Sequence, residues 1–128
     1  MTASIKIEHQ AKDCPEVTIS PGELQQVVVN LIMNSLQAMT GQGTLKIICG
    51  PKMRDGVSGA AIIVGDTGTG IPEAQLKTVF DPFYTTKLGA GTGLGLSISQ
   101  TLVQNAGGLI TARNLTPQGA EFTVWLPV

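Results

Sequence analysis

The chain has 128 residues, of which 42% are hydrophobic and 13% are charged, and its formal net charge is −1. This length predicts one domain with a single core, and the composition excludes a disordered segment. Without a basic excess the chain has little to attract nucleic acid, and no apolar run approaches the ~20 residues of a membrane span. We therefore expect a globular, cytoplasmic domain that itself contacts neither nucleic acid nor a membrane.

The chain has two cysteines, Cys14 and Cys49, and one histidine. Their spacing matches no metal-binding pattern, so we expect no zinc site. The sequence predicts two reduced cysteines, as is usual for a cytoplasmic protein, rather than a disulfide.

The first third of the chain predicts a strand pair followed by a long helix. "SIKIEHQ" and "EVTIS" read as strands joined by the turn "AKDCP". A helix follows, with Ser20 as N-cap, Pro21 in the first turn, Glu23 completing a capping box and Gly41 as the stop. Its apolar residues lie largely on one stripe at helical spacing: Leu24, Val27, Val28, Leu31, Leu36 and Met39.

The rest of the chain alternates strands and helices. "TLKIICG" and "GAAIIVGDTGTG" predict strands flanking the polar hairpin "PKMRDGVS", and a short helix is expected from Pro72. After the loop "DPFYTTKLGAGTG" comes the helix "LGLSISQTLVQNAGG", and "LITARNLT" and "AEFTVWLP" form a hairpin across "PQG". This order predicts an α+β fold: a two-layer sandwich with a mixed sheet and about three helices on one face.

The stretch "GTGLGLSIS", Gly91 to Ser99, has the glycine spacing of a phosphate-binding loop before a helix. It is not a P-loop, because Leu96 stands where a lysine should follow Gly95. It is not a dinucleotide fingerprint either, because no strand precedes it and the next acidic residue is Glu121.

Two further features indicate a nucleotide pocket. Asp66 directly follows a predicted strand, where its carboxylate can accept a hydrogen bond from an exocyclic amine, although a lone D-x-G usually marks a simple Asx turn. Asn30 and Asn34 share one face of the long helix, where amide oxygens suit Mg²⁺, although both can also be surface amides.

Four segments in order, "NLIMNSLQAM", "GDTGTGIP", "FDPFYTTK" and "GTGLGLSIS", resemble the N, G1, F and G2 boxes of the sensor histidine kinase catalytic domain. That domain belongs to the superfamily of gyrase-, chaperone- and mismatch-repair-type ATPases, which share the Bergerat ATP-binding fold. The resemblance extends from "SIKIEH" to "TVWLP" and is closest to the nitrogen-regulation type of kinase.

The resemblance implies a role for each matching residue. Asn34 would coordinate Mg²⁺ on the ATP phosphates, Asn30 would face the same phosphates, and Asp66 would bind adenine N6. Lys87 would reach the terminal phosphate from a lid that is mobile from about residue 85 to 93. The remaining residues implied to contact the nucleotide or to anchor the lid are Gly68, Gly70, Ile71, Phe80, Phe83, Tyr84, Thr85, Thr86, Gly91, Thr92, Gly93, Leu94, Gly95 and Leu96.

The implied activity is transfer of the γ-phosphoryl of ATP to a histidine on a separate phosphoacceptor domain, and from there indirectly to a response regulator. Hydrolysing relatives carry a glutamate base where this chain has Asn30, and kinases often carry a cation where it has Gln37. No phosphoacceptor helix pair precedes the first strand, so we expect a monomeric catalytic domain over residues 1–128. The alternatives are a regulatory module that binds ATP without catalysis and a serine kinase of the anti-sigma-factor type.

Overall fold

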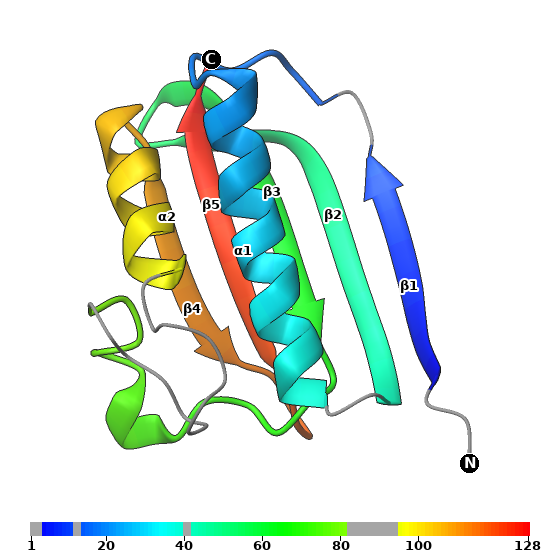
Figure 1. The fold of residues 1–128 in the computed structure, drawn as a ribbon. Coiled ribbons are helices and arrows are strands. Elements are labelled where there is room, and N and C mark those ends of the chain that lie inside the picture. The colour runs from blue at the N-terminus through cyan, green and yellow to red at the C-terminus, as the bar shows by residue number, and fades with distance from the viewer. Residues whose placement is uncertain (1–3, 12–13, 40–41, 82–94) are drawn as a thin grey trace.

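The computed structural model describes residues 4–11, 14–39, 42–81 and 95–128. Their elements are β1 (Ser4–Ala11), α1 (Pro21–Met39), β2 (Gln42–Arg54), β3 (Val57–Asp66), a 3₁₀ helix (Glu73–Gln75), α2 (Gly95–Asn105), β4 (Leu109–Asn114) and β5 (Ala120–Pro127). The strands form one sheet in the order β1-β2-β3-β5-β4, in which only β1 and β2 pair in parallel. Figure 1 shows α1 and α2 on the same face of this sheet. The α+β two-layer sandwich with a mixed sheet is confirmed.

The start of α1 and the end of α2 follow the sequence signals, and the predicted stop at Gly41 lies outside the described residues. At the start of α1, the Ser20 hydroxyl donates to the Glu23 carboxylate (2.9 Å), and the Glu23 backbone N–H donates to Ser20 Oγ (3.3 Å). After α2, Gly107 takes φ +84°, and the N–H of Gly108 donates to the Val103 carbonyl (2.9 Å). These bonds occupy backbone groups that would otherwise lack partners at the helix ends.

The core lies between the helices and the sheet. Val27 and Leu31 of α1 are fully buried against the inward residues of the central strands, including Val64 and Phe122. Phe80 packs edge-on against Phe122, with ring centroids 6.0 Å apart. Phe80 is therefore part of the core, which fixes the chain immediately before residue 82.

The predicted pairing of "SIKIEHQ" with "EVTIS" is wrong. β1 instead pairs in parallel with β2, with Ala11 opposite Cys49, and residues 14–20 form no strand. A parallel pair needs a long connection, and α1 supplies it. "EVTIS" instead leads into α1 and contributes Ile19 to the core.

The predicted hairpin "PKMRDGVS" is confirmed, and most of its residues belong to the two strands. β2 and β3 pair as far as Arg54 opposite Val57, so the turn is reduced to Asp55 and Gly56. Both have positive φ, +51° and +79°, as two-residue hairpin turns with a D-G sequence require.

The helix expected from Pro72 is a single 3₁₀ turn at Glu73–Gln75. An α-helix at this position would need an apolar stripe to bury, but residues 72–75 are all exposed. The described residues thus contain two α-helices instead of the predicted three helices. None of these helices has the length and hydropathy needed to cross a membrane.

The cysteines are also not as predicted, because Cys14 and Cys49 form a disulfide, with Cα atoms 5.9 Å apart. The pairing of Ala11 with Cys49 explains their proximity, since Cys14 follows three residues later. The bond attaches the segment before α1 to β2. Sequence spacing gave no sign of it, because 35 positions separate the two residues.

Phe122→Ala should strongly destabilise the fold. Phe122 is completely buried and supports Phe80, so its loss should lower the free energy of unfolding by about 3–5 kcal/mol. Urea unfolding followed by tryptophan fluorescence measures this, with Ile7→Ala as control. Ile7 is 63% exposed, so the control should change by less than about 0.5 kcal/mol. Similar losses in the two variants would contradict this account of the core.

Candidate functional site

A buried carboxylate stands at the end of the central strand β3. Asp66 is 2% exposed, and its Oδ1 accepts hydrogen bonds from the backbone N–H groups of Gly68 (2.9 Å) and Ala120 (3.4 Å). Its Oδ2 is also buried but has no hydrogen-bond partner within the described ranges. Buried polar atoms are normally paired, so the free oxygen marks a place where a donor from a ligand can bind. The expected Asx turn is thus present, and it uses only one of the two oxygens.

Burial raises the pKa of Asp66, because the ionised carboxylate loses its hydration. The backbone N–H of Gly68, the hydroxyl of Ser35 and the backbone N–H of Ala120 act in the opposite direction and lower the pKa. Ser35 is completely buried on α1, on the row of residues that faces the sheet. None of these contributions comes from a charged group.

Two glycines let the backbone close around Asp66. A Cβ on Gly68 would lie 2.5 Å from the Ala38 carbonyl oxygen, so the loop after β3 can approach the last turn of α1 only with glycine there. Gly119 has φ +108°, and a Cβ on it would collide with the Asp66 carbonyl oxygen. Glycine at positions 68 and 119 therefore allows the backbone to pack closely on both sides of Asp66, against α1 and before the start of β5.

The loop after β3 is fixed by the side chain of Asn114, which ends β4. Asn114 Oδ1 accepts from the N–H of Ile71 (2.7 Å), and its Nδ2 donates to the Ile71 carbonyl (2.6 Å). Gly70 precedes this contact with φ +78°, a conformation that favours glycine. Ile71 itself is buried in the core. The loop is therefore held in one conformation beside Asp66.

The two helices are joined through Asn30. Its Nδ2 donates to the Gly95 carbonyl (3.1 Å) and to Ser99 Oγ (3.2 Å), and the Ser99 hydroxyl donates back to the Gly95 carbonyl (2.9 Å). Ser99 is completely buried. The amide of α1 thus fixes the first turn of α2, the turn that follows the glycine-rich stretch of the sequence.

Asn34 lies one turn beyond Asn30 on α1 and is partly buried. Its spacing places it on the same helix face, between Asn30 and the end of the helix near Asp66. Leu96, the second residue of α2, is buried in the core. The structure therefore brings Asn30, Asn34, Gly95 and Leu96 to the helix side of the sheet.

Several predicted site residues fall in the part of the chain that the structure does not describe. The expected motion of the lid lies there as well. These residues are Phe83, Tyr84, Thr85, Thr86, Lys87, Gly91, Thr92, Gly93 and Leu94.

Sequence reasoning missed four residues that shape the site: Ser35, Ser99, Asn114 and Gly119. Ser35 had a usable signal, because it interrupts the buried row formed by Val27, Leu31 and Met39 at intervals of four residues. The others had none, since Asn30, Ile71 and Asp66, which they contact, lie far away in the sequence.

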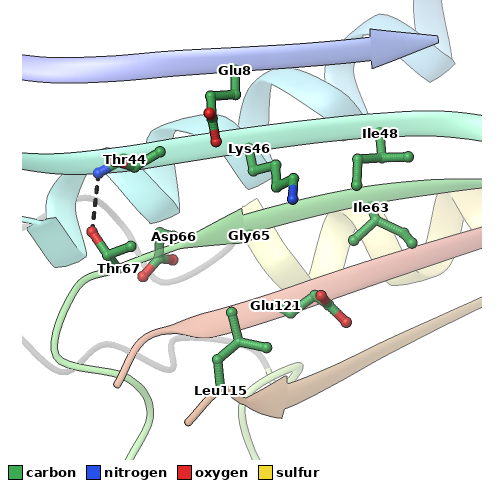
Figure 2. Close-up of a pocket in the computed structure, with 10 residues that line it drawn as sticks. All are labelled: Glu8, Thr44, Lys46, Ile48, Ile63, Gly65, Asp66, Thr67, Leu115 and Glu121. Carbon is green, nitrogen blue, oxygen red and sulfur yellow. Dashed lines mark hydrogen bonds between the residues drawn. The ribbon is translucent and has the colours of Figure 1, made fainter. Parts of the chain in front are cut away.

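The outer face of the sheet carries a separate shallow hollow of about 220 Å³. Figure 2 shows Glu8, Lys46 and Glu121 pointing into it from three different strands, with the helices behind the sheet. Asp66 borders the hollow from the end of β3, but the groups that act on its carboxylate come from α1 and the adjoining backbone. The hollow is therefore distinct from the site on the helix side.

No three His, Cys, Asp or Glu side chains in the described ranges are grouped so that they could hold a metal ion. An amide oxygen such as that of Asn34 is a hard ligand that suits Mg²⁺, but one amide is not a complete site. Such residues fit a magnesium ion that arrives with phosphate oxygens and keeps water molecules as its other ligands.

A mixed sheet covered by two helices, with an incompletely paired buried carboxylate at its end, defines a two-layer ligand-binding domain. The chain belongs to the family described as histidine kinase-, DNA gyrase B-, and HSP90-like ATPase, whose profile matches residues 19–128. The family resemblance found in the four sequence boxes is thereby confirmed.

Individual relatives agree with this assignment. Sensor histidine kinase ZraS of Escherichia coli O157:H7 is 38% identical over 125 residues, which cover 97% of this chain and 26% of the relative. The solved catalytic domain of histidine kinase ThkA, described as nucleotide-free, has a TM-score of 0.80 at 31% identity, over 96% of this chain and 78% of that chain. Full-length ShkA in complex with AMPPNP has a TM-score of 0.78 at 28% identity, over 98% of this chain and 26% of that chain. This chain spans about a quarter of the length of the curated relative.

Asn30→Ala should loosen the first turn of α2. The variant loses two neutral hydrogen bonds and gains helix propensity, so the free energy of unfolding should fall by roughly 1 kcal/mol. Hydrogen exchange should become faster at the backbone amides of residues 98–101. Gln26→Ala is the matched control, an exposed amide one turn earlier on α1, and should leave α2 unchanged. Unchanged exchange in Asn30→Ala would show that the link does not hold the helix.

Asp66→Asn should stabilise the fold near neutral pH. Because the pKa of Asp66 is raised in the folded state, its proton favours folding fully below 3.8, and this contribution is lost as the pH rises through the raised pKa. Asparagine stays neutral at every pH, and its Oδ1 can accept the same two backbone hydrogen bonds.

Urea unfolding at a series of pH values measures this effect. The advantage of Asp66→Asn over the parent chain should shrink as the pH is lowered through the raised pKa. Asp55→Asn, an exposed carboxyl in the turn between β2 and β3, should change the free energy of unfolding by less than about 0.5 kcal/mol. A pH-independent difference for Asp66→Asn would contradict the prediction.

Proposed function

We propose that residues 1–128 are the catalytic and ATP-binding domain of a sensor histidine kinase. The domain would bind Mg-ATP and transfer its γ-phosphoryl to a histidine on a separate dimerisation and phosphoacceptor domain, acting in the cytoplasm. The observation that carries this proposal is Asp66 Oδ2, a buried acceptor without a partner in the described structure. Family membership supports ATP as the ligand that would supply the missing donor.

At the base end, Asp66 would accept a hydrogen bond from the exocyclic N6 amine of adenine. Its other oxygen is occupied by Gly68 and Ala120, so the carboxylate is already oriented before a ligand binds. Gly68, Gly70 and Ile71 would form the adjoining wall, which Asn114 holds in place.

At the phosphate end, Asn34 would be the protein ligand of Mg²⁺, with phosphate oxygens and water completing the shell. Gly95 and Leu96 begin α2, whose N-terminus favours a negative charge. Tyr84, Thr85, Thr86, Lys87, Gly91, Thr92, Gly93 and Leu94 keep the roles that the family resemblance implies, with Lys87 directed to the terminal phosphate.

The chemistry would be phosphoryl transfer by positioning and charge neutralisation. A nitrogen of the acceptor imidazole forms a bond to the γ-phosphorus, while the bond from that phosphorus to the bridging oxygen breaks and ADP leaves with the electron pair. Asn30 cannot take a proton from water at neutral pH, so hydrolysis would lack a base at this position. Asn30 would also keep the first turn of α2 beside the phosphates.

The alternatives differ in chemistry, not in fold. A regulatory module would bind ATP and transfer nothing, and a serine kinase would form an acid-stable phosphoester. The similarity to ZraS and ThkA favours a histidine acceptor.

Titration with a non-hydrolysable ATP analogue, with and without Mg²⁺, tests the pocket. The protein should bind the analogue more tightly with Mg²⁺. Asp66→Asn should lower the affinity by roughly 100-fold, because a charge-assisted hydrogen bond is lost and an N–H group faces the amine. Asn34→Ala should remove the effect of Mg²⁺.

Asp55→Asn is the control for this titration. It makes the same change in an exposed side chain of the turn before β3, at the opposite end of that strand from Asp66, and the affinity should be unchanged. If the parent chain does not bind the analogue at millimolar concentration, the proposal is wrong for this domain.

Incubation with ATP and a separately supplied phosphoacceptor domain distinguishes the remaining alternatives. An acid-labile phosphorylated product indicates histidine transfer, and an acid-stable one indicates a serine kinase. Binding without any product supports the regulatory module.

A further inference from the structure

Strand β1 leaves one edge of the sheet open. It pairs with β2 along one side, and no strand among the described residues pairs with its other side. Figure 1 shows β1 at the margin of the sheet, with neither helix lying over it. An open edge presents backbone N–H and C=O groups that can pair with a further strand. β1 is therefore a candidate surface for strand addition.

The helix side of β1 carries an uncovered apolar side chain. Ile7 lies opposite Leu45 of β2, and residues paired across two strands share one face of the sheet, so Ile7 points to the side on which α1 lies. Leu45 is buried in the core, whereas Ile7 is 63% exposed, because no helix extends over β1. A strand added at this edge would remove apolar surface of Ile7 from water.

The outer side of the sheet carries a row of charges that alternate in sign from strand to strand. The row follows the paired positions of the five strands: Arg113, Glu121, Gly65, Lys46 and Glu8. Arg113 and Glu121 form an ion pair (2.8 Å), and Figure 2 shows Lys46 and Glu8 on adjacent strands beside the hollow. The row ends at β1 with an acidic residue, so a strand added there is favoured if it places a basic residue next to Glu8.

A second copy of β1 supplies that basic residue. Lys6 and Glu8 lie on the same face of the strand, with Nζ and Oε2 3.6 Å apart. In an antiparallel pair with Ile7 opposite Ile7 of the second copy, Lys6 lies opposite Glu8 of the second copy. The two-fold axis repeats this ion pair, with Glu8 opposite Lys6 of the second copy. A shift of two residues in either direction would instead oppose two lysines or two glutamates, so the charges select one register.

We propose that β1 is a homodimerisation edge, through which two copies of this domain pair antiparallel with Ile7 at the two-fold axis and reciprocal ion pairs between Lys6 and Glu8. The two five-stranded sheets then join into one continuous sheet. The sequence predicts a monomeric domain, and the open, self-complementary edge of β1 is the observation that favours a dimer. This inference is independent of the proposed function, because none of the residues proposed to bind ATP lies on β1.

The contact is weak by the standard of permanent dimers. Each copy contributes one strand of eight residues, which is small beside the about 1,200–2,000 Å² that stable interfaces bury. We therefore expect a reversible dimer with a dissociation constant of about 100 μM.

Sedimentation equilibrium at increasing protein concentration measures the association. The parent chain should pass from monomer to dimer as the concentration rises. Glu8→Lys should raise the dissociation constant by at least about tenfold, because both ion pairs become opposed lysines. The side chains of Lys6 and Glu8 are exposed, so the variants should fold, and thermal melting in dilute solution checks this.

Exchanging the two charges tests the register. Lys6→Glu alone should be as defective as Glu8→Lys. Lys6→Glu/Glu8→Lys has the same composition as the parent chain and recreates both ion pairs, so it should dimerise as tightly as the parent chain. The two single variants should also associate with each other when mixed, because one copy then presents two lysines and the other presents two glutamates.

Arg113→Glu is the matched control for charge. It reverses an exposed basic residue of β4, the strand at the opposite edge, and changes the net charge by the same amount as Lys6→Glu. The dissociation constant of this variant should equal that of the parent chain. In hydrogen exchange, the amides of β1 should be slower in concentrated than in dilute protein, and those of β4 should be the same in both.

The proposal is wrong if the parent chain stays monomeric at about 1 mM, tenfold above the expected dissociation constant. It is also wrong if the dimer is insensitive to Glu8→Lys, or if Arg113→Glu weakens it as much as Lys6→Glu does. Binding of the ATP analogue is a separate readout. A monomer that binds the analogue overturns only the dimer, and a dimer that does not bind it overturns only the proposed function.

Discussion

The carboxylate of Asp66 is buried, with one oxygen hydrogen-bonded and the other without a partner in the described structure. The loop after β3, the start of β5 and two glycines are arranged around it. Oδ1 receives backbone N–H groups from the loop after β3 and from the first residue of β5, which orients the side chain. The approach requires glycine at Gly68, against α1, and at Gly119, against the Asp66 backbone. The other oxygen gives the site its proposed chemistry, because it is a buried acceptor that a donor from a ligand can satisfy.

A second polar contact lies at the phosphate end of the proposed site. Asn30 bonds the first turn of α2, and Asn34 lies one turn nearer to Asp66 along α1. Both asparagines of the proposed site therefore come from one element, α1. Its own position is fixed by the buried row of Val27, Leu31 and Met39 against the sheet.

Local signals in the sequence were reliable where neighbouring residues decide the structure. The cap at Ser20, the glycines after α2 and the hairpin of β4 and β5 were all predicted, since each depends on a few adjacent residues. The parallel pairing of β1 with β2 and the disulfide at Cys49 were missed, because they join segments separated by the whole of α1. The 3₁₀ turn after Pro72 was taken for a helix, because local propensity does not reveal that its residues have nothing to pack against.

The sequence by itself determined the fold class, the family and the kinds of side chain at the candidate site. Four ordered motifs contain Asn30, Asn34, Asp66 and the glycines. It could not decide which of those side chains remain free to bind. Only the tertiary structure shows that one oxygen of Asp66 is occupied and that the Asn30 amide is bonded to α2. The physical reason is that a hydrogen bond is satisfied by groups near in space, and those groups come from distant parts of the chain.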